Sequence, residues 1–525
     1  MPQLTLTWLF AALVIWQVPV AAQPIIAVQS TMKSRPCTPL SVAPQEKPRL
    51  RPTRIGLMDD RHHALAEVAV GWEKTRVPLV GFDGQQLVAA GCGDDIAMYY
   101  VVPMLARAAR IALTDAVDLF LAGIVLISAI AGALGLILVC RVPFGRLVSI
   151  AAIVLLSLLA LRTGDIYVVQ SSVVLALVPW ILFFGRNRRS RWQLLAFVFF
   201  GSAVLATANL FRTHAGTGVL IFMGWLVAFN PQHKRKFKLL LAFAALVGML
   251  VPVVYFRILL DTRDAYLKKN GHVATAFRQH VFWHTIYVGL GYINNDVVPS
   301  YRDEVAQGRV REVAPQTIAY SLEYERYIKL EVMRTVRKHP FLVFETLAAK
   351  VGVIVGLVLV CANLGLVAAY RYPKHWPIEV AFWNAIAFQA LFGILAIPVL
   401  PYLLGLIAFT VLYAVISIDV ALQRGTLRDL SRLIRSRRPL RDVTDPNRRW
   451  RGLELSTQRS VPDHEKQQSC ICSSGVAAEE ESDNFCPYDK ERLSMQTDPI
   501  HKSNPALWRP ETDNCPGPDL SIKPK

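Results

Sequence analysis

Residues 341–360 read FLVFETLAAKVGVIVGLVLV, an apolar run with a single lysine and a single glutamate. A helix of about 20 such residues crosses a hydrocarbon core about 30 Å thick. Similar runs lie at 4–28, 118–140, 147–161, 166–184, 193–210, 216–230, 238–256, 342–370, 377–399 and 402–420. The pattern predicts an all-α, polytopic membrane helical bundle of about 10 spans, with tilt or partial insertion at the shorter runs.

Composition agrees with this class. The chain has 525 residues, of which 53% are hydrophobic and 18% are charged, so a single soluble domain is excluded. Its net charge of +18 would indicate a nucleic-acid partner in a soluble protein. Here the basic residues lie beside the apolar runs and in the tail, so we expect membrane lipid as the partner and no nucleic acid. The sequence does not indicate the oligomeric state.

Basic residues in the short loops predict the orientation. One face holds most of them, whereas Arg162 and Arg212 stand alone in the short loops of the other face. The basic set is Arg141, Arg146, Arg186, Arg188, Arg189, Arg191, Lys234, Arg235, Lys236, Lys238, Arg371 and Lys374. The positive-inside rule makes this face cytoplasmic in a multi-pass protein of the cell (inner) membrane.

The same parity assigns the domains. Residues 1–28 form a first span or signal anchor, and residues 29–117 and 257–341 are exported loops on one side of the spans at 118–256 and 342–420. We expect residues 421–525, a polar segment with an arginine-rich start, to be a disordered cytoplasmic tail.

Two acidic pairs lie in the first exported loop. Asp59 and Asp60 occur in LMDDRHHALAEVAVGW (57–72), and Asp94 and Asp95 in GCGDDIAMYYVVPMLARAARIAL (91–113). Either pair can cap the helix that follows it. Capping and catalysis explain each pair equally well, but two pairs on one exported loop exceed what capping requires.

The second exported loop contains RQHVFWHTIYVGLGYINNDVVPSYRDE (278–304), which mixes ionisable and aromatic side chains. This mixture is unusual in a solvated linker and indicates either a site or a packed cap. His280 and His284 have the helical spacing of two metal ligands, but Val281 stands where HExxH has glutamate and no third ligand is near. No cofactor is firmly implied, and a divalent metal is the weaker reading. The phosphate-loop and dinucleotide motifs are absent.

The order of these features resembles the integral-membrane C-class (GT-C) glycosyltransferases, the superfamily of the protein O-mannosyltransferases and the lipid A aminoarabinose transferase. The shared features are one span, an exported acidic pair opening a helix, an amphipathic helix with Pro103, many spans and a large later exported loop. The resemblance implies that an exported acid after the first span acts in catalysis, first Asp59 and Asp60 and then Asp94 and Asp95. A linker of about 30 residues before Asp59 and the unpaired Pro103 depart from the family pattern.

This chemistry gives roles to the remaining candidates. Sugar transfer from a polyprenyl phosphate has an anionic leaving group, so one base and some cations suffice. We expect an exported aspartate to be the base, with the lipid-linked donor held by Arg278, His280, His284, Arg212, His214 and Arg257. Trp283 and Tyr292 can stack on a sugar. Interface anchoring explains each of these side chains equally well.

Other function classes use the same residues. A transporter or flippase of a lipid-linked or anionic solute predicts internal repeats and charges in mid-span, neither of which is clear. A surface-polysaccharide polymerase or ligase uses exported arginine and histidine without an acid in the first loop. Lys350, five positions after Glu345, fits an ion pair, snorkelling or a phosphate contact. Asp165 is most simply a residue of a short exported turn, and its position also allows it to line a cavity on the exported side of the bundle.

Overall fold

A computed structural model describes residue 53 and residues 55–84, 86–90, 95–186, 190–231, 233–272 and 282–426. The expected first span (1–28) and the expected tail beyond residue 426 lie outside the described residues. Within the described part, eight helices are long and apolar enough to cross a membrane. They are α4 (Leu113–Val139), α5 (Pro143–Thr163), α6 (Val168–Arg186), α7 (Arg191–Phe211), α9 (Arg235–Lys269), α13 (Pro340–Arg371), α14 (Trp376–Leu395) and α15 (Leu400–Ala421). The prediction of an all-α polytopic membrane protein is confirmed.

One apolar run forms a helix too short to span the hydrocarbon core by itself. α8 (Thr217–Phe229) has 13 residues and is about 20 Å long. It nevertheless connects the end of α7 to the start of α9, and it packs against α14. The span before the second loop is longer than expected, because the helix of α9 continues beyond residue 257 to Lys269.

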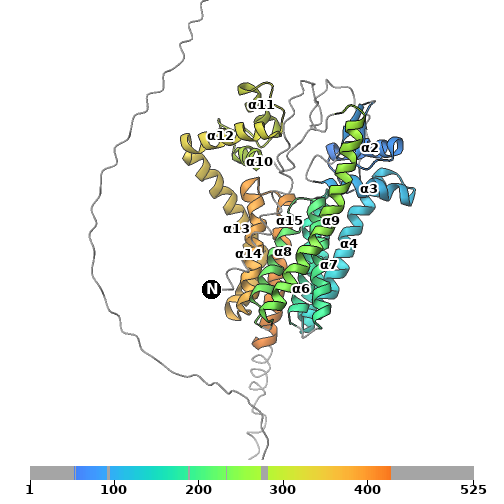
Figure 1. Ribbon diagram of the computed structural model, residues 1–525. Coiled ribbons are helices and arrows are strands. Elements are labelled where there is room, and N and C mark those ends of the chain that lie inside the picture. Colours follow the sequence, from blue (N-terminus) through green and yellow to red (C-terminus); the bar gives the residue numbers. More distant parts are fainter. Residues whose placement is uncertain are drawn as a thin grey trace, which may run out of the picture. The chain divides into compact units, whose positions relative to one another are not determined.

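Short connections make successive long helices antiparallel and give the bundle two ends. At one end, here called the loop end, α5, α7, α9 and α14 finish and α4, α6, α8, α13 and α15 begin. Helices distant in sequence pack together, among them α4 with α6, α7 with α9 and α13 with α15 (Figure 1). Of the eight long helices, α15 is the most enclosed, because 83% of the residues in its most apolar stretch are buried. In α13 only 17% of the corresponding residues are buried. α15 therefore runs through the core, and α13 presents most of its surface to the surroundings.

The first loop folds into α2 (Asp59–Thr75), the antiparallel hairpin of β1 (Val80–Asp83) and β2 (Gln86–Ala89), and α3 (Ile96–Ala109). Leu65 and Val68 form the buried face of α2. Gly71 lies directly under β1, since a Cβ added there would be 1.9 Å from the carbonyl oxygen of Val80. Only glycine permits this approach of helix to strand.

The second loop has a hydrophobic core of its own. Its elements are α10 (Phe282–Gly289), the 3₁₀ turn η1 (Leu290–Tyr292), α11 (Asp303–Val313) and α12 (Leu322–Lys338). Outside this loop, a short helical turn, η2 (Leu422–Thr426), follows α15. Tyr287, Val298, Ala306, Tyr324 and Ile328 are buried against one another. This part of the loop is a packed unit attached to the start of α13.

Candidate functional site

A buried aspartate at the loop end is held by two arginines from distant parts of the chain. The Nε of Arg61, on α2, lies 2.6 Å from Oδ2 of Asp95, the residue before α3. Nη1 of Arg212, just after α7, lies 3.3 Å from Oδ1 of the same carboxylate. Asp95 is 4% exposed, and the arginine side chains are 14% and 13% exposed. Both oxygens of Asp95 are therefore engaged with cations.

A second carboxylate completes the group. Arg61 also donates through Nη1 to Oδ2 of Asp165, in the turn between α5 and α6. Oδ1 of Asp165 is buried and has no hydrogen-bond partner in the described part of the chain. Asp165 has a φ of 57°, and the preceding Gly164 has a φ of 66° and is pressed against the carbonyl oxygen of Ile55. This turn is held in the left-handed region by its surroundings.

Three tyrosines connect the charged residues to the second loop. Arg212 donates from Nη2 to the hydroxyl of Tyr167 at 2.9 Å, and its guanidinium carbon lies 4.4 Å from the centre of that ring. Tyr167 packs edge-to-face on Tyr402, at the start of α15, with 5.1 Å between ring centres. The hydroxyls of Tyr402 and Tyr301 are 3.4 Å apart. Residues of both loops thus meet at the loop end.

We call Arg61, Asp95, Asp165, Tyr167 and Arg212 the arginine–aspartate cluster. Burial works to lower the pKa of Arg61, but the two carboxylates beside it outweigh burial and raise that pKa, so the guanidinium remains charged. Burial raises the pKa of Asp165, with Arg61 opposing the change. Burial also raises the pKa of Tyr167, which is a neutral phenol. The cluster pairs two cations with two carboxylates in a poorly solvated place, where an anion would compete for the arginines.

Two of the predicted site residues are in this cluster, namely Asp95 and Arg212. His214 follows closely, with a φ of 65° and its ring against Phe388 and Phe392. Arg257 is on the exposed surface of α9, where it pairs with Asp261 one helical turn away. Three further predicted residues, Asp94, Arg278 and His280, lie outside the described residues. The backbone of Asp59 and Asp60 opens α2, but the side chains of these two residues are not described.

His284 is part of the core of the second loop. Its Nδ1 is 2.7 Å from the hydroxyl of Tyr324, and its Nε2 is 3.2 Å from Oδ1 of Asp303. The buried carboxylate of Glu325 accepts the backbone N–H groups of Trp283 and His284 and so caps the start of α10. Both ring nitrogens of His284 are thus used within the loop. Among the described residues, no group of three histidine, cysteine, aspartate or glutamate side chains could hold a metal ion.

Lys350 and the two aromatic candidates each contact a different partner at the loop end. Lys350 is 2% exposed, and its Nζ donates to the carbonyls of Ala396 at 2.6 Å and Ile394 at 3.1 Å, beyond and at the end of α14. The ring of Tyr292 lies 6.0 Å from the same ammonium. Trp283 lies under the ammonium of Lys329 at 5.5 Å. The contacts of Lys350 favour neither an ion pair with Glu345, nor snorkelling, nor a phosphate contact. The ammonium instead binds carbonyl groups at the C-terminal end of α14.

Sequence reasoning missed Arg61, Tyr167, Tyr301 and Tyr402 and treated Asp165 as a turn residue. Two local features of the sequence point toward the site: Arg61 directly follows the acidic pair of Asp59 and Asp60, and Asp165 lies in a turn on the predicted exported side. Nothing local to either residue indicates that they pair, because 104 positions separate them.

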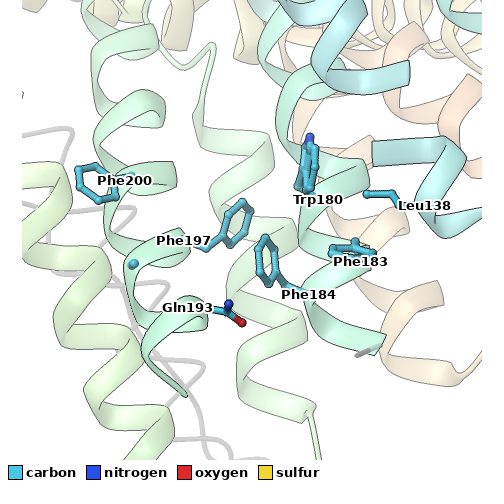
Figure 2. A pocket seen from close by; sticks show the side chains of 8 residues that line it. Leu138, Trp180, Phe183, Phe184, Gln193, Phe197 and Phe200 are labelled. Atoms are coloured by element: carbon cyan, nitrogen blue, oxygen red, sulfur yellow. The ribbon is translucent and has the colours of Figure 1, made fainter. Parts of the chain in front are cut away.

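A laterally open apolar groove lies between α4, α6 and α7 (Figure 2). It has a volume of about 620 Å³ and is lined by Leu138, Trp180, Phe183, Phe184, Gln193, Ala196, Phe197 and Phe200. Phe184 and Phe197 stack at 4.5 Å, and the indole N–H of Trp180 is satisfied by the carbonyl of Ala131 at 2.9 Å. Phe183 follows Tyr167 by 16 positions, which is about 24 Å along a helix. The groove is therefore far from the cluster but on the same two helices.

Comparison of the chain with protein-family models, with curated protein sequences and with solved structures finds no match.

Proposed function

We propose that this protein is a membrane glycosyltransferase that moves a sugar from a polyprenyl-phosphate donor to an acceptor hydroxyl on the predicted exported side. The observation that carries the proposal is the contact between Asp95 and Arg212, at 3.3 Å. The sequence nominates one as an acid and the other as a phosphate-binding cation for this chemistry.

Energetics support a functional role for the cluster. Removing two arginines and two aspartates from water costs several kcal/mol per ion, and an ion pair in a protein interior repays this only with excellent geometry. Apolar side chains would stabilise the same place at least as well. An arrangement of charges that is poor as a stabiliser is more readily explained by binding and reaction chemistry.

The residues suit the steps of the transfer. Arg61 and Arg212 are planar multiple donors, and such groups bind phosphate oxygens through paired hydrogen bonds. They can hold the donor phosphate and stabilise the charge that develops on it as the sugar leaves. A carboxylate of the cluster takes the proton of the acceptor hydroxyl. Of the four acids that the resemblance indicates, Asp59 and Asp60 first and Asp94 and Asp95 second, Asp95 is the one that lies in the cluster.

The apolar groove supports a lipid-linked donor. The exported ends of α6 and α7 carry Tyr167 and Arg212, and the same helices line the groove farther along (Figure 2). A donor whose phosphate binds the arginines could extend its chain along these helices toward the groove.

The test uses the purified protein in lipid nanodiscs with a panel of radiolabelled polyprenyl-phosphate sugars, scoring transfer and hydrolysis. Arg212→Gln should lower donor use by at least about tenfold, because a charged hydrogen-bond donor to the phosphate is lost. Arg107→Gln is the matched control, since Arg107 is an exposed arginine of α3 outside the cluster, and it should leave the rate unchanged.

Two results would contradict the proposal. One is a folded wild-type protein that neither transfers nor hydrolyses any donor of the panel. The other is equal activity of Arg212→Gln and wild type. Movement of labelled lipid-linked sugar across proteoliposome membranes without chemical change would favour the flippase alternative.

A further inference from the structure

We infer that Asp165, and not Asp95, accepts the proton of the acceptor hydroxyl through Oδ1, and that Arg61, bound at Oδ2, weakens this carboxylate as a base until a donor phosphate attracts the guanidinium. The inference rests on the proposed function and names the base within it. It also implies an order of events, because the carboxylate becomes the stronger base only after the donor is bound.

The first support is the unmatched hydrogen-bonding capacity of Asp165. Asp165 is 4% exposed, and its Oδ1 has no hydrogen-bond partner within the described ranges. Buried polar atoms are nearly always paired in folded proteins, so an unpaired carboxylate oxygen needs an explanation. A lone pair left open for a reaction partner is such an explanation.

The second support is the fixed backbone at the same residue. Asp165 has a φ of 57°, in the left-handed region that aspartate enters more readily than most L-residues, and Gly164 before it also has a positive φ. The carbonyl of Ile55 lies where a Cβ of Gly164 would be. The turn is therefore clamped from outside, so the carboxylate of Asp165 is held in one position beside Arg61, as a preorganised reactive group requires.

Asp95 offers a contrast within the same cluster. Nε of Arg61 donates to Oδ2 of Asp95 at 2.6 Å, and Nη1 of Arg212 donates to Oδ1 of Asp95 at 3.3 Å. Its carboxylate thus orients both guanidinium groups, which suits a residue that positions the arginines for phosphate. Of the two carboxylates, only Asp165 keeps an oxygen without a partner in the described chain.

Arg61 controls the basicity of Asp165 because its guanidinium bridges both carboxylates and binds Asp165 at Oδ2. The charged and titratable groups acting on Asp165 are Arg61 from α2, Asp95 from the turn before α3, and Arg212 after α7, and the backbone of Ile166 also works to lower its pKa. Burial raises the pKa of Asp165, while Arg61 opposes that rise. The donor phosphate is a phosphodiester monoanion, which gains a second negative charge as the sugar leaves. When it attracts Arg61, this opposition weakens and Asp165 becomes a stronger base. Donor binding therefore activates the carboxylate.

The transfer exchanges one bond at the anomeric carbon of the sugar for another. The acceptor oxygen forms a bond to the anomeric carbon of the sugar, and the bond from that carbon to the phosphate oxygen breaks. The electron pair of the broken bond stays on the phosphate, which Arg61 and Arg212 hold. The hydroxyl proton passes to Oδ1 of Asp165 and later to water.

The decisive variant is Asp165→Asn, measured in nanodiscs with a donor that the wild type uses. Asparagine tolerates the left-handed backbone and can still accept from Arg61, but it cannot take a proton. We expect kcat to fall about 100- to 10,000-fold while KM for the donor stays within about twofold. Asp95→Asn should show the opposite split, with a raised donor KM, because it loosens both arginines.

A second variant guards against misfolding. Asp165→Gly accepts the positive φ, and added formate should restore part of its rate, which a purely structural role would not allow. Wild-type kcat in Asp165→Asn, a change confined to donor KM, or failure of formate to restore activity to folded Asp165→Gly would each overturn the inference. Those outcomes leave the proposed function intact, whereas inactivity of the wild type with every donor would refute the proposed function itself.

Discussion

Arg212 places its Nη1 3.3 Å from Oδ1 of Asp95, although 117 positions separate the two residues. The contact joins the end of a long helix to the first loop, at the place where that loop enters α3. Arg61 and Asp165 extend the contact to α2 and to the turn between α5 and α6. One buried group of charges thus ties four segments together, and its disruption should have both stability and activity consequences.

Loss of the central carboxylate should destabilise the fold. Asp95→Ala leaves two buried guanidinium groups without their shared partner, and breaking a buried pair from one side costs about 3 to 5 kcal/mol. Asp83→Ala removes an exposed carboxylate from the same loop and should change stability by less than about 0.5 kcal/mol. Thermal unfolding in nanodiscs, followed by tryptophan fluorescence, measures both. Equal melting temperatures for the two variants would show that the cluster contributes little to the fold.

The predicted orientation can be checked with single cysteines at exposed positions. Glu73→Cys on α2 and Glu304→Cys on α11 should react with a membrane-impermeant thiol reagent in intact cells, because both loops are predicted to be exported. Lys236→Cys, at the opposite end of the bundle, should react only after the cells are opened. Labelling on opposite sides for Glu73→Cys and Glu304→Cys would contradict the contacts between the loops. The reverse pattern at all three positions would invert the orientation.

The groove provides a prediction about donor chain length. Ala196→Trp places a large ring into the groove and should reduce use of long-chain polyprenyl donors several-fold, with little effect on donors shortened to a few isoprene units. Val204→Trp, on the same helix at a position that is 47% exposed and outside the groove lining, is the control. Competition between long and short donors in one assay gives the ratio directly. An unchanged ratio in Ala196→Trp would remove the groove from donor binding.

The second loop should lose stability in acid through Asp303. Its hydrogen bond with His284 holds the pKa of Asp303 below its usual value, and the hydroxyl of Tyr320 adds to this. A depressed carboxyl pKa contributes stability above the unfolded-state value of about 3.9, and this contribution disappears as the pH falls through the folded-state pKa. Asp303→Asn should therefore show a smaller loss of stability between about pH 5 and pH 3 than wild type. Hydrogen exchange of α10 and α11 across this range measures the difference, and parallel curves would count against the assignment.

Hydropathy and the parity of the spans, both read from the sequence alone, were sufficient to predict the long apolar helices of the described chain and the position of both long loops at one end of the bundle. A run of about 20 apolar residues satisfies its own backbone hydrogen bonds as a helix, so no distant partner is needed to define it. The same reasoning nominated Asp95 and Arg212, because both lie on the predicted exported side. It could not rank the spans: α13 and α15 are both strongly apolar, yet α15 is enclosed and α13 is exposed.

Only the tertiary structure decided the composition of the site. Arg61 meets Asp165 across 104 positions and Tyr301 meets Tyr402 across 101, and neither pair leaves a periodic or spacing signal. His284 and Arg257 satisfied the same sequence criteria as Arg212, but one is enclosed in the core of the second loop and the other lies on the exposed side of α9. The physical reason is that hydropathy places a residue at a membrane depth, whereas its neighbours at that depth depend on how the helices pack around α15 and how the two loops fold over their ends.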